Sequence, residues 1–333
     1  MATGPTSPLG SITVADAIAN ATNKPAHRLV IDPLVAREET SLLTSQPREG
    51  KTWWLLGGGI AVAYGEKLAG RFPTEQTNVL YCSNEDGERA VANRLQMLMN
   101  GLGKTQAPDT FRLFVGRGLW LDDPGWQQKL IDEARAFNTG LVMFDPLRSL
   151  TACVDKGPSD LQPFARFQRQ LIGETGCAIW SGHHDTKWQS RFPDDRRPAQ
   201  RSSGGGLFSI SDAPISIDHI DDTKSLFVPD GFKHCETPAP FIVKRLIVDD
   251  AVFLMVTEAS KGKSGADLAL VEEVRDFLRT HPCTSGSQIA EQLKRQKARV
   301  FDALKSLRAN GQAGFEKKGQ AYFWELRELC PPD

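Results

Sequence analysis

The segment SLLTSQPREGKT, residues 41–52, joins a short apolar run to a polar loop and then to a helical pattern. Its last part matches the phosphate-loop pattern G-x-x-x-x-G-K-[ST] at Gly50, Lys51 and Thr52, but Ser45 takes the place of the first glycine. A strand that passes through a tight turn into a helix N-terminus presents backbone N–H groups to a phosphate. The segment therefore predicts a nucleotide-binding loop, and the alternative is a chance Gly-Lys-Thr at a helix start.

Each loop residue has an expected task. Lys51 would reach the β- and γ-phosphates of ATP, Thr52 would hold Mg²⁺, and Gly50 would let the backbone approach closely. The serine at position 45 costs mainly backbone freedom, so we expect nucleotide binding and hydrolysis to persist. The predicted nucleotide-binding residues are Ser45, Gln46, Pro47, Arg48, Glu49, Gly50, Lys51, Thr52 and Trp53.

Outward from this loop, short apolar runs alternate with helical patterns. The runs cover residues 41–45, 78–83, 111–116, 140–145 and 177–182. Strands that alternate with helices predict an α/β fold with a parallel sheet and right-handed crossovers. Asp123 and Pro124 are typical of an N-cap and first helical residue, and residues 241–256 predict a hairpin that turns at Asp249 and Asp250.

Polar residues follow several of these apolar runs. Asp145 ends a strand in the way of a Walker B acid that holds Mg²⁺, and Glu85 is placed to polarise the attacking water. His183 and His184 end another strand, where a donor could sense the γ-phosphate. Each has a plainer interpretation: a turn cap for Asp145, a helix N-terminal acid for Glu85 and loop histidines for the pair.

In this order, SQPREGKTW, YCSNED, LVMFDPLRSL and TGCAIWSGHHDTK resemble the RepA-like branch of RecA-fold ATPases, which are hexameric replicative helicases and related ATPases. The resemblance covers residues 29–258. It implies that Lys51 and Thr52 bind phosphate and magnesium, that Asp145 is the Walker B acid, and that Glu85 is the catalytic base. It also implies that His183 or His184 is the γ-phosphate sensor. In QRSSGGGLFSISDA the spacing differs slightly from the family pattern, and Arg201 takes the place of an arginine finger, with Asp212 after it.

Composition limits the kind of partner and compartment. The net charge of the 333-residue chain is −1, so any contact with nucleic acid must come from local patches. The six cysteines form no C-x-x-C pair, which argues against a zinc site or disulfide framework and fits a reducing cytoplasm. Residues 1–17 lack the pattern of a secretion signal, and no apolar run is long enough to predict a membrane span.

The polar segment 185–206 predicts a DNA contact. Its cations are interleaved with Trp188 and Phe192, as in channels that bind single-stranded nucleic acid. The plainer alternative is a solvated loop whose charge is blunted by Asp194 and Asp195. The candidate DNA-binding residues here are Lys187, Arg191, Arg196 and Arg197.

The C-terminal part predicts a winged helix-turn-helix domain. Residues 268–281 form one amphipathic helix, Ser287 is a candidate N-cap of a second, and a third ends at Gly311 before a two-stranded wing. Positive charge gathers on the third helix and its approach, as a groove-reading helix requires, although winged helices also dock proteins. The candidate DNA contacts are Lys294, Arg295, Lys297, Arg299, Lys317 and Lys318.

The predicted organisation is an N-terminal segment (1–28), a RecA-like ATPase domain (29–258), a linker (259–266) and the winged-helix domain (267–329). The favoured function is that of a Mg-ATP-dependent replicative DNA helicase of a mobile element. It would be a homo-oligomer, expected to be a hexamer, with single-stranded DNA in its channel and duplex DNA at the winged helix. The alternatives are an ATP-regulated DNA-binding loader or regulator, and the ATPase subunit of a defence system. Each alternative would work without unwinding DNA, and a replication or defence protein is a further expected partner.

Overall fold

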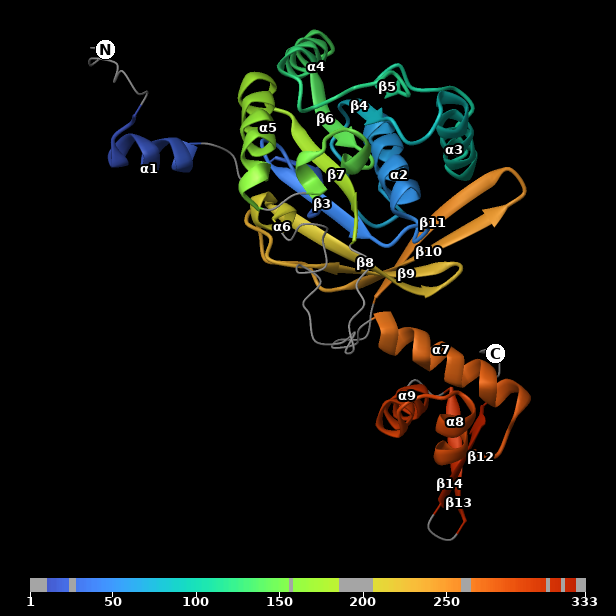
Figure 1. The fold of residues 1–333 in the computed structure, drawn as a ribbon. Helices are drawn as coiled ribbons and strands as arrows, with labels where there is room; N and C mark the ends of the chain where they lie inside the picture. The colour runs from blue at the N-terminus through green and yellow to red at the C-terminus, as the bar shows by residue number, and fades with distance from the viewer. Residues whose placement is uncertain are drawn as a thin grey trace.

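A nine-stranded sheet forms the centre of the molecule, with strand order β11-β10-β9-β8-β3-β7-β6-β4-β5 (Figure 1). The computed structural model describes residues 11–23, 28–155, 158–185, 206–258, 265–309, 312–318 and 321–327. The parallel strands are β3 (Thr40–Ser45), β4 (Asn78–Ser83), β5 (Phe111–Val115), β6 (Thr139–Phe144), β7 (Ala178–His184) and β8 (Ala213–Asp221). The predicted α/β class with a mostly parallel sheet is confirmed.

Three antiparallel strands extend this sheet beyond β8. They are β9 (Lys224–Pro229), β10 (Phe241–Val248) and β11 (Ala251–Glu258). The hairpin between β10 and β11 turns at Asp249 and Asp250, as the sequence predicted, and Asp249 has a positive φ of 52°. A separate two-stranded sheet joins β1 (Leu29–Ile31) to β2 (Val35–Ala36).

Helices cover both faces of the central sheet. α2 (Lys51–Tyr64) and α3 (Glu88–Gly101) contribute to one hydrophobic cluster, and α4 (Pro124–Ala136) and α5 (Gln162–Thr175) contribute to the other. Successive residues of β6 divide between them, with Leu141 and Met143 in the first cluster and Val142 and Phe144 in the second. This alternation explains why the strand reads as a continuous apolar run: both of its faces are buried.

The remaining helical segments are short or peripheral. They are α1 (Val14–Asn23), α6 (Leu207–Ile210) and the 3₁₀ turns Leu147–Ser149, Cys153–Asp155 and Pro158–Leu161. Within the described ranges, no helix combines the length and the apolar character needed to cross a bilayer.

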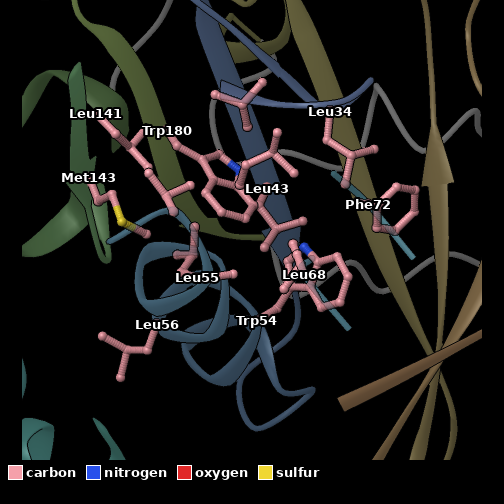
Figure 2. Close-up of a cluster of buried hydrophobic side chains, with 14 of the residues drawn as sticks. Leu34, Leu43, Trp54, Leu55, Leu56, Leu68, Phe72, Leu141, Met143 and Trp180 are labelled. Atoms are coloured by element: carbon pink, nitrogen blue, oxygen red, sulfur yellow. The ribbon is translucent and has the colours of Figure 1, made fainter. Parts of the chain in front are cut away.

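Helix α2 lies unusually close to the sheet because of its glycines. Figure 2 shows Trp180 and Leu43 of the sheet beside Trp54 and Leu55 of this helix. A Cβ on Gly58 would come within 2.3 Å of the Trp180 ring, so only glycine fits there. The first turn of α2 is equally close to β7, because a Cβ on Gly182 would come within 3.1 Å of the Lys51 stem.

Helix boundaries follow local capping. α2 ends at Tyr64 because Gly65 adopts a left-handed φ of 70° and its N–H bonds back to the carbonyls of Ala61 and Val62. Asp123 caps α4 as predicted, and its carboxylate accepts hydrogen bonds from the N–H groups of Gly125 and Trp126.

Residues 265–327 form a C-terminal unit with its own hydrophobic cluster, which includes Val274, Leu304 and Trp324. Its elements are α7 (Gly265–Thr280), β12 (Thr284–Ser285), α8 (Gly286–Gln292), α9 (Lys297–Ala309), β13 (Ala313–Lys318) and β14 (Ala321–Leu326). The predicted N-cap Ser287 is wrong: Ser285 caps α8 and forms a capping box with Gln288. Gly311 lies outside the described residues. The unit lies against the sheet through α7 and β8.

Candidate nucleotide-binding site

The loop between β3 and α2 explains why serine is tolerated at position 45. Ser45 is the last residue of β3, pairs with His184 on one side and Ile217 on the other, and is 1% exposed. The left-handed conformations fall further along, at Arg48 with φ 72° and at Gly50 with φ 87°. Extended backbone suits any residue, so the position of the missing glycine makes no demand for one.

The bend of the loop is held by polar contacts within it. The N–H of Gln46 donates to Glu49 Oε2 at 3.1 Å, and the Ser45 hydroxyl donates to the carbonyl of Gln46 at 2.9 Å. Helix α2 then begins at Lys51, directly after Gly50. The N–H groups of this first turn have no partner within the helix and are available to an anion.

Lys51 and Asp145 form a buried ion pair at the centre of the site. Lys51 Nζ lies 3.2 Å from Asp145 Oδ1, and the two side chains are 6% and 1% exposed. The Tyr81 hydroxyl donates to the other carboxylate oxygen, Oδ2, at 3.1 Å. Burial and the charge of Asp145 raise the pKa of Tyr81 well above its usual value, so its proton stays available for this bond. A Cβ at Gly182 would come within 2.7 Å of Asp145 Oδ1, so the strand beside the carboxylate must carry glycine.

The two histidines at the end of β7 face opposite sides of the sheet. His184 lies on the side of α2, and its Nε2 is 3.7 Å from Glu85 Oε2. Burial and nearby Lys51 lower the pKa of His184, although Glu85 opposes the shift, so the ring is neutral near pH 7. His183 is fully buried, and neither ring nitrogen has a hydrogen-bond partner among the described residues. Burial, followed by the charges of His184 and Lys51, lowers the pKa of His183 to about 3.

These groups surround one cavity of about 440 Å³. Of the two predicted sensors only His184 reaches it, while His183 does not. The cavity is lined by Ser45, Gln46, Pro47, Arg48, Gly50, Lys51, Thr52, Trp53, Glu85, Asp86, Arg94, Asp145, Pro146, His184 and Arg245. Four strand or loop ends that are distant in the sequence therefore meet at one place, and Glu49 is the predicted loop residue that lines the neighbouring cavity instead.

The donor set fits a triphosphate with a hard cation. Lys51 and the helix N-terminus supply positive charge, and Thr52, Asp145 and Glu85 supply oxygen atoms to the same cavity. Mg²⁺ favours such oxygen ligands and usually takes only one or two from protein, with phosphates and water completing its shell. In the part of the chain that the structure describes, no group of three or more His, Cys, Asp or Glu side chains could hold a metal alone.

Two arginines that the sequence motifs did not reveal, Arg94 and Arg245, complete the lining of the cavity. Arg94 of α3 forms an ion pair with Asp86 and lies 6.0 Å from the Trp53 ring. Arg245 of β10 is half-buried, burial lowers its pKa, and it forms no ion pair with any described residue. Its Nη1 lies 3.2 Å from the position of a Cβ on Gly50. A signal was present: Arg245 alternates with Phe241 and Val243, which face the core.

A second cavity, of about 570 Å³, continues past the loop. It shares Pro47, Arg48, Gly50, Trp53 and Arg245 with the first. Its far wall comes from the turn between β8 and β9, including Asp221, Asp222 and Thr223. The two cavities together are large enough for an extended ligand with an anionic end.

Of the remaining predicted residues, five are not described by the structure and one, Asp212, lies outside the cavity. Lys187, Arg191, Arg196, Arg197 and Arg201 are outside the described residues. Asp212 holds the start of β3: its carboxylate accepts from the N–H and hydroxyl of Thr40 and pairs with Lys233. Burial raises the pKa of Asp212, but the bonds from Lys233 and Thr40 outweigh burial and lower it.

The predicted DNA contacts of the C-terminal unit fall in two places, at the start of α9 and on β13. Lys294, Arg295 and Lys297 are exposed at the turn that leads into α9, and Arg299 is half-buried. Arg295 Nε lies 3.1 Å from Glu273 Oε2 of α7. Lys317 on β13 is exposed and lies 5.9 Å from the Tyr322 ring. Lys318 ends the same strand.

A strand, loop and helix that enclose a buried Lys–Asp pair at the carboxyl ends of a parallel sheet define a P-loop ATPase of the RecA-like fold. Comparison with known families agrees. The AAA domain model AAA_25 matches residues 5–190, more than half of the chain, and the chain belongs to this family. No curated protein matches the chain.

Solved structures show the same fold at low sequence identity. A DnaB-like replicative helicase, described with its interactions with primase, is 12% identical with a TM-score of 0.52, over 73% of this chain and 67% of that chain. A second solved structure, described as an ATPase domain, is 11% identical with a TM-score of 0.54, over 74% of this chain and 99% of that chain. These likenesses establish the arrangement of strands and helices.

Proposed function

We propose that the chain is a Mg-ATP-dependent, DNA-associated motor, a RepA-like replicative DNA helicase of a mobile element. The observation that carries the proposal is the single cavity where Lys51, Thr52, Glu85, Asp145 and His184 meet. Its relatives in fold include a protein described as a DnaB-like replicative helicase. The RepA-like pattern of residues adds the more specific role.

The chain's own residues would divide the work of hydrolysis. Lys51 leaves its ion pair with Asp145 and takes up a phosphate, because a triphosphate offers more negative charge than one carboxylate. Glu85 accepts the proton of the attacking water. His184, which lies beside Glu85, is neutral near pH 7 and therefore does not compensate the negative charge of the Glu85 carboxylate. The neutral ring would donate a hydrogen bond to the γ-phosphate.

Mg²⁺ would be held by the Thr52 hydroxyl and the Asp145 carboxylate, and it would neutralise charge on the phosphates. Tyr81 keeps the Asp145 carboxylate oriented through its hydrogen bond to Oδ2. Arg201 of a neighbouring copy is the proposed arginine finger, which requires a ring-like homo-oligomer, and we propose a hexamer.

DNA would be contacted in two places. The segment with Lys187, Arg191, Arg196 and Arg197 would line the channel for single-stranded DNA. The C-terminal unit would act as a winged helix, with Lys294, Arg295, Lys297 and Arg299 around α9 and Lys317 and Lys318 on the wing. The exposure of the cations before α9 supports this second contact.

ATP hydrolysis and strand displacement on a forked duplex test the proposal. Lys51→Ala should abolish nucleotide binding, and Glu85→Gln should preserve binding but lower hydrolysis by about a hundredfold or more. Glu88→Gln is the matched control, because Glu88 is a nearby exposed acid outside the cavity. Unchanged nucleotide affinity in Lys51→Ala would refute the site.

A second function is favoured by the ion pair between Arg295 and Glu273. In this structure the pair engages Arg295, which is one of the residues proposed to contact DNA. A DNA-binding loader or regulator, or a defence ATPase, could use ATP to control such a contact without unwinding. DNA-stimulated hydrolysis with no strand displacement would reject the helicase and support this class.

A further inference from the structure

The start of β9, just after the turn that follows β8, touches the nucleotide loop directly. The hydroxyl of Ser225 donates to the carbonyl of Glu49 at 3.1 Å. On the neighbouring strand the N–H of Arg245 donates to the carbonyl of Thr223 at 2.7 Å. Arg245 lines both cavities, and Asp221 and Thr223 line the second. A ligand that moves the loop or attracts Arg245 therefore acts on this turn.

Lys224, the first residue of β9, contacts the C-terminal unit. Lys224 Nζ lies 3.2 Å from Asp221 Oδ2 and 3.8 Å from Glu272 Oε1 on α7. Lys224 and Glu272 are 27% and 24% exposed, so water only partly screens the pair. Adjacent residues, 224 and 225, thus face the C-terminal unit and the nucleotide loop.

Helix α7 links the Lys224 contact to α9. Glu273, next to Glu272, pairs with Arg295 at the entry to α9. Val274 and Leu278 of α7 share a buried cluster with Leu304 and Leu307 of α9, so the unit moves as one packed body. The proposed DNA-reading helix is therefore rigidly linked to the helix that Lys224 holds.

We propose that nucleotide occupancy controls the docking of the C-terminal unit on the ATPase core through Lys224. This inference rests on the nucleotide binding proposed above. Phosphate groups in the cavity attract Arg245, whose N–H holds the carbonyl of Thr223, and the shift of Thr223 moves the adjacent Lys224 and weakens its 3.8 Å contact with Glu272. With this contact weakened, the packing of α7 on β8 holds the unit less firmly, and α7 with the helices packed on it shifts towards a state that engages DNA.

The size of the effect follows from the contact. A half-buried ion pair of this length contributes at most about 1 kcal/mol, which corresponds to about a fivefold change in an equilibrium. Because coupling is reciprocal, DNA at the C-terminal unit should strengthen nucleotide binding by the same factor that nucleotide strengthens DNA binding.

Hydrogen exchange of the full chain, with and without AMP-PNP and Mg²⁺, tests the inference. AMP-PNP should speed exchange of the amides in residues 270–280 about two- to fivefold. Lys224→Ala should exchange fast without nucleotide and show no further response. Lys104→Ala, which removes the ion pair with Glu66 on the surface of the core, is the matched control and should respond as the native chain does.

The outcomes separate the two proposals. If calorimetry shows that AMP-PNP binds while exchange in residues 270–280 is unchanged, the coupling is refuted and the nucleotide site stands. If AMP-PNP does not bind, the proposed function fails and the coupling fails with it. A nucleotide response that survives in Lys224→Ala also overturns the inference, because another contact would then carry it.

Discussion

Replacing Lys51 by methionine should destabilise the ATPase core by about 3–5 kcal/mol, because it strands a buried charge. Asp145 is 1% exposed and its counter-charge lies 3.2 Å away. The Tyr81 hydroxyl would remain as a partner but is neutral, so it replaces only part of the lost interaction. Methionine preserves much of the volume of the lysine stem, so the loss reports charge rather than packing.

Urea unfolding followed by tryptophan fluorescence measures this loss. With an m-value of about 3 kcal/mol/M, the midpoint should fall by more than about 1 M. The decisive comparison is the double variant Lys51→Met, Asp145→Asn, which removes both charges and should recover most of the stability. A double variant no more stable than the single one would refute the buried ion pair. The same measurement shows whether a loss of hydrolysis in Lys51 variants reflects chemistry or unfolding.

Three further predictions follow from single side chains. His183 has a folded pKa of about 3 against about 6.5 unfolded, so its contribution is complete above pH 6.5 and declines as the pH falls. Between pH 7.5 and 5.5 the native chain should lose about 1.4 kcal/mol more than His183→Gln in urea unfolding, and parallel losses would contradict the buried neutral ring. Gly50→Ala and the control Gly70→Ala both place a Cβ at positive φ and should each cost about 1–2 kcal/mol, but only Gly50, beside Arg245, should also weaken binding of a fluorescent ATP analogue. Ser285→Ala should cost about 1 kcal/mol and speed hydrogen exchange in α8, whereas Ser287→Ala should leave exchange unchanged because Ser285 is the cap.

The parallel strands β3 to β7 and the polar residues at their ends were predictable because each depends only on the local pattern of apolar residues. The buried run of β6 and the cap at Asp123 needed only neighbouring residues. The RepA-like role, the hexamer and the tasks of Glu85 and His184 stay predictions, since they depend on ligands and other copies of the chain.

Features that depend on distant contacts were beyond the sequence. Arg245 shares a face of β10 with Phe241 and Val243, which the alternation of the strand indicates, but only the order of strands in the sheet brings that face to the cavity. His183 and His184 are neighbours in sequence, so only the side of the sheet on which α2 packs decides which one meets the nucleotide cavity. Ser287 was the predicted cap of α8, and the capping box between Ser285 and the side chain of Gln288 places the cap two residues earlier.

The contact of Gly58 with Trp180 has an evolutionary consequence. A Cβ at position 58 would lie 2.3 Å from the indole, so position 58 cannot gain a side chain without lifting α2 from the sheet, whereas a smaller residue at 180 would leave a cavity. A larger residue at 58 becomes acceptable only after position 180 has shrunk, and the indole at 180 persists only while 58 stays glycine. Related chains should therefore show these two positions changing together, and the pair would serve as a marker of descent independent of the nucleotide loop.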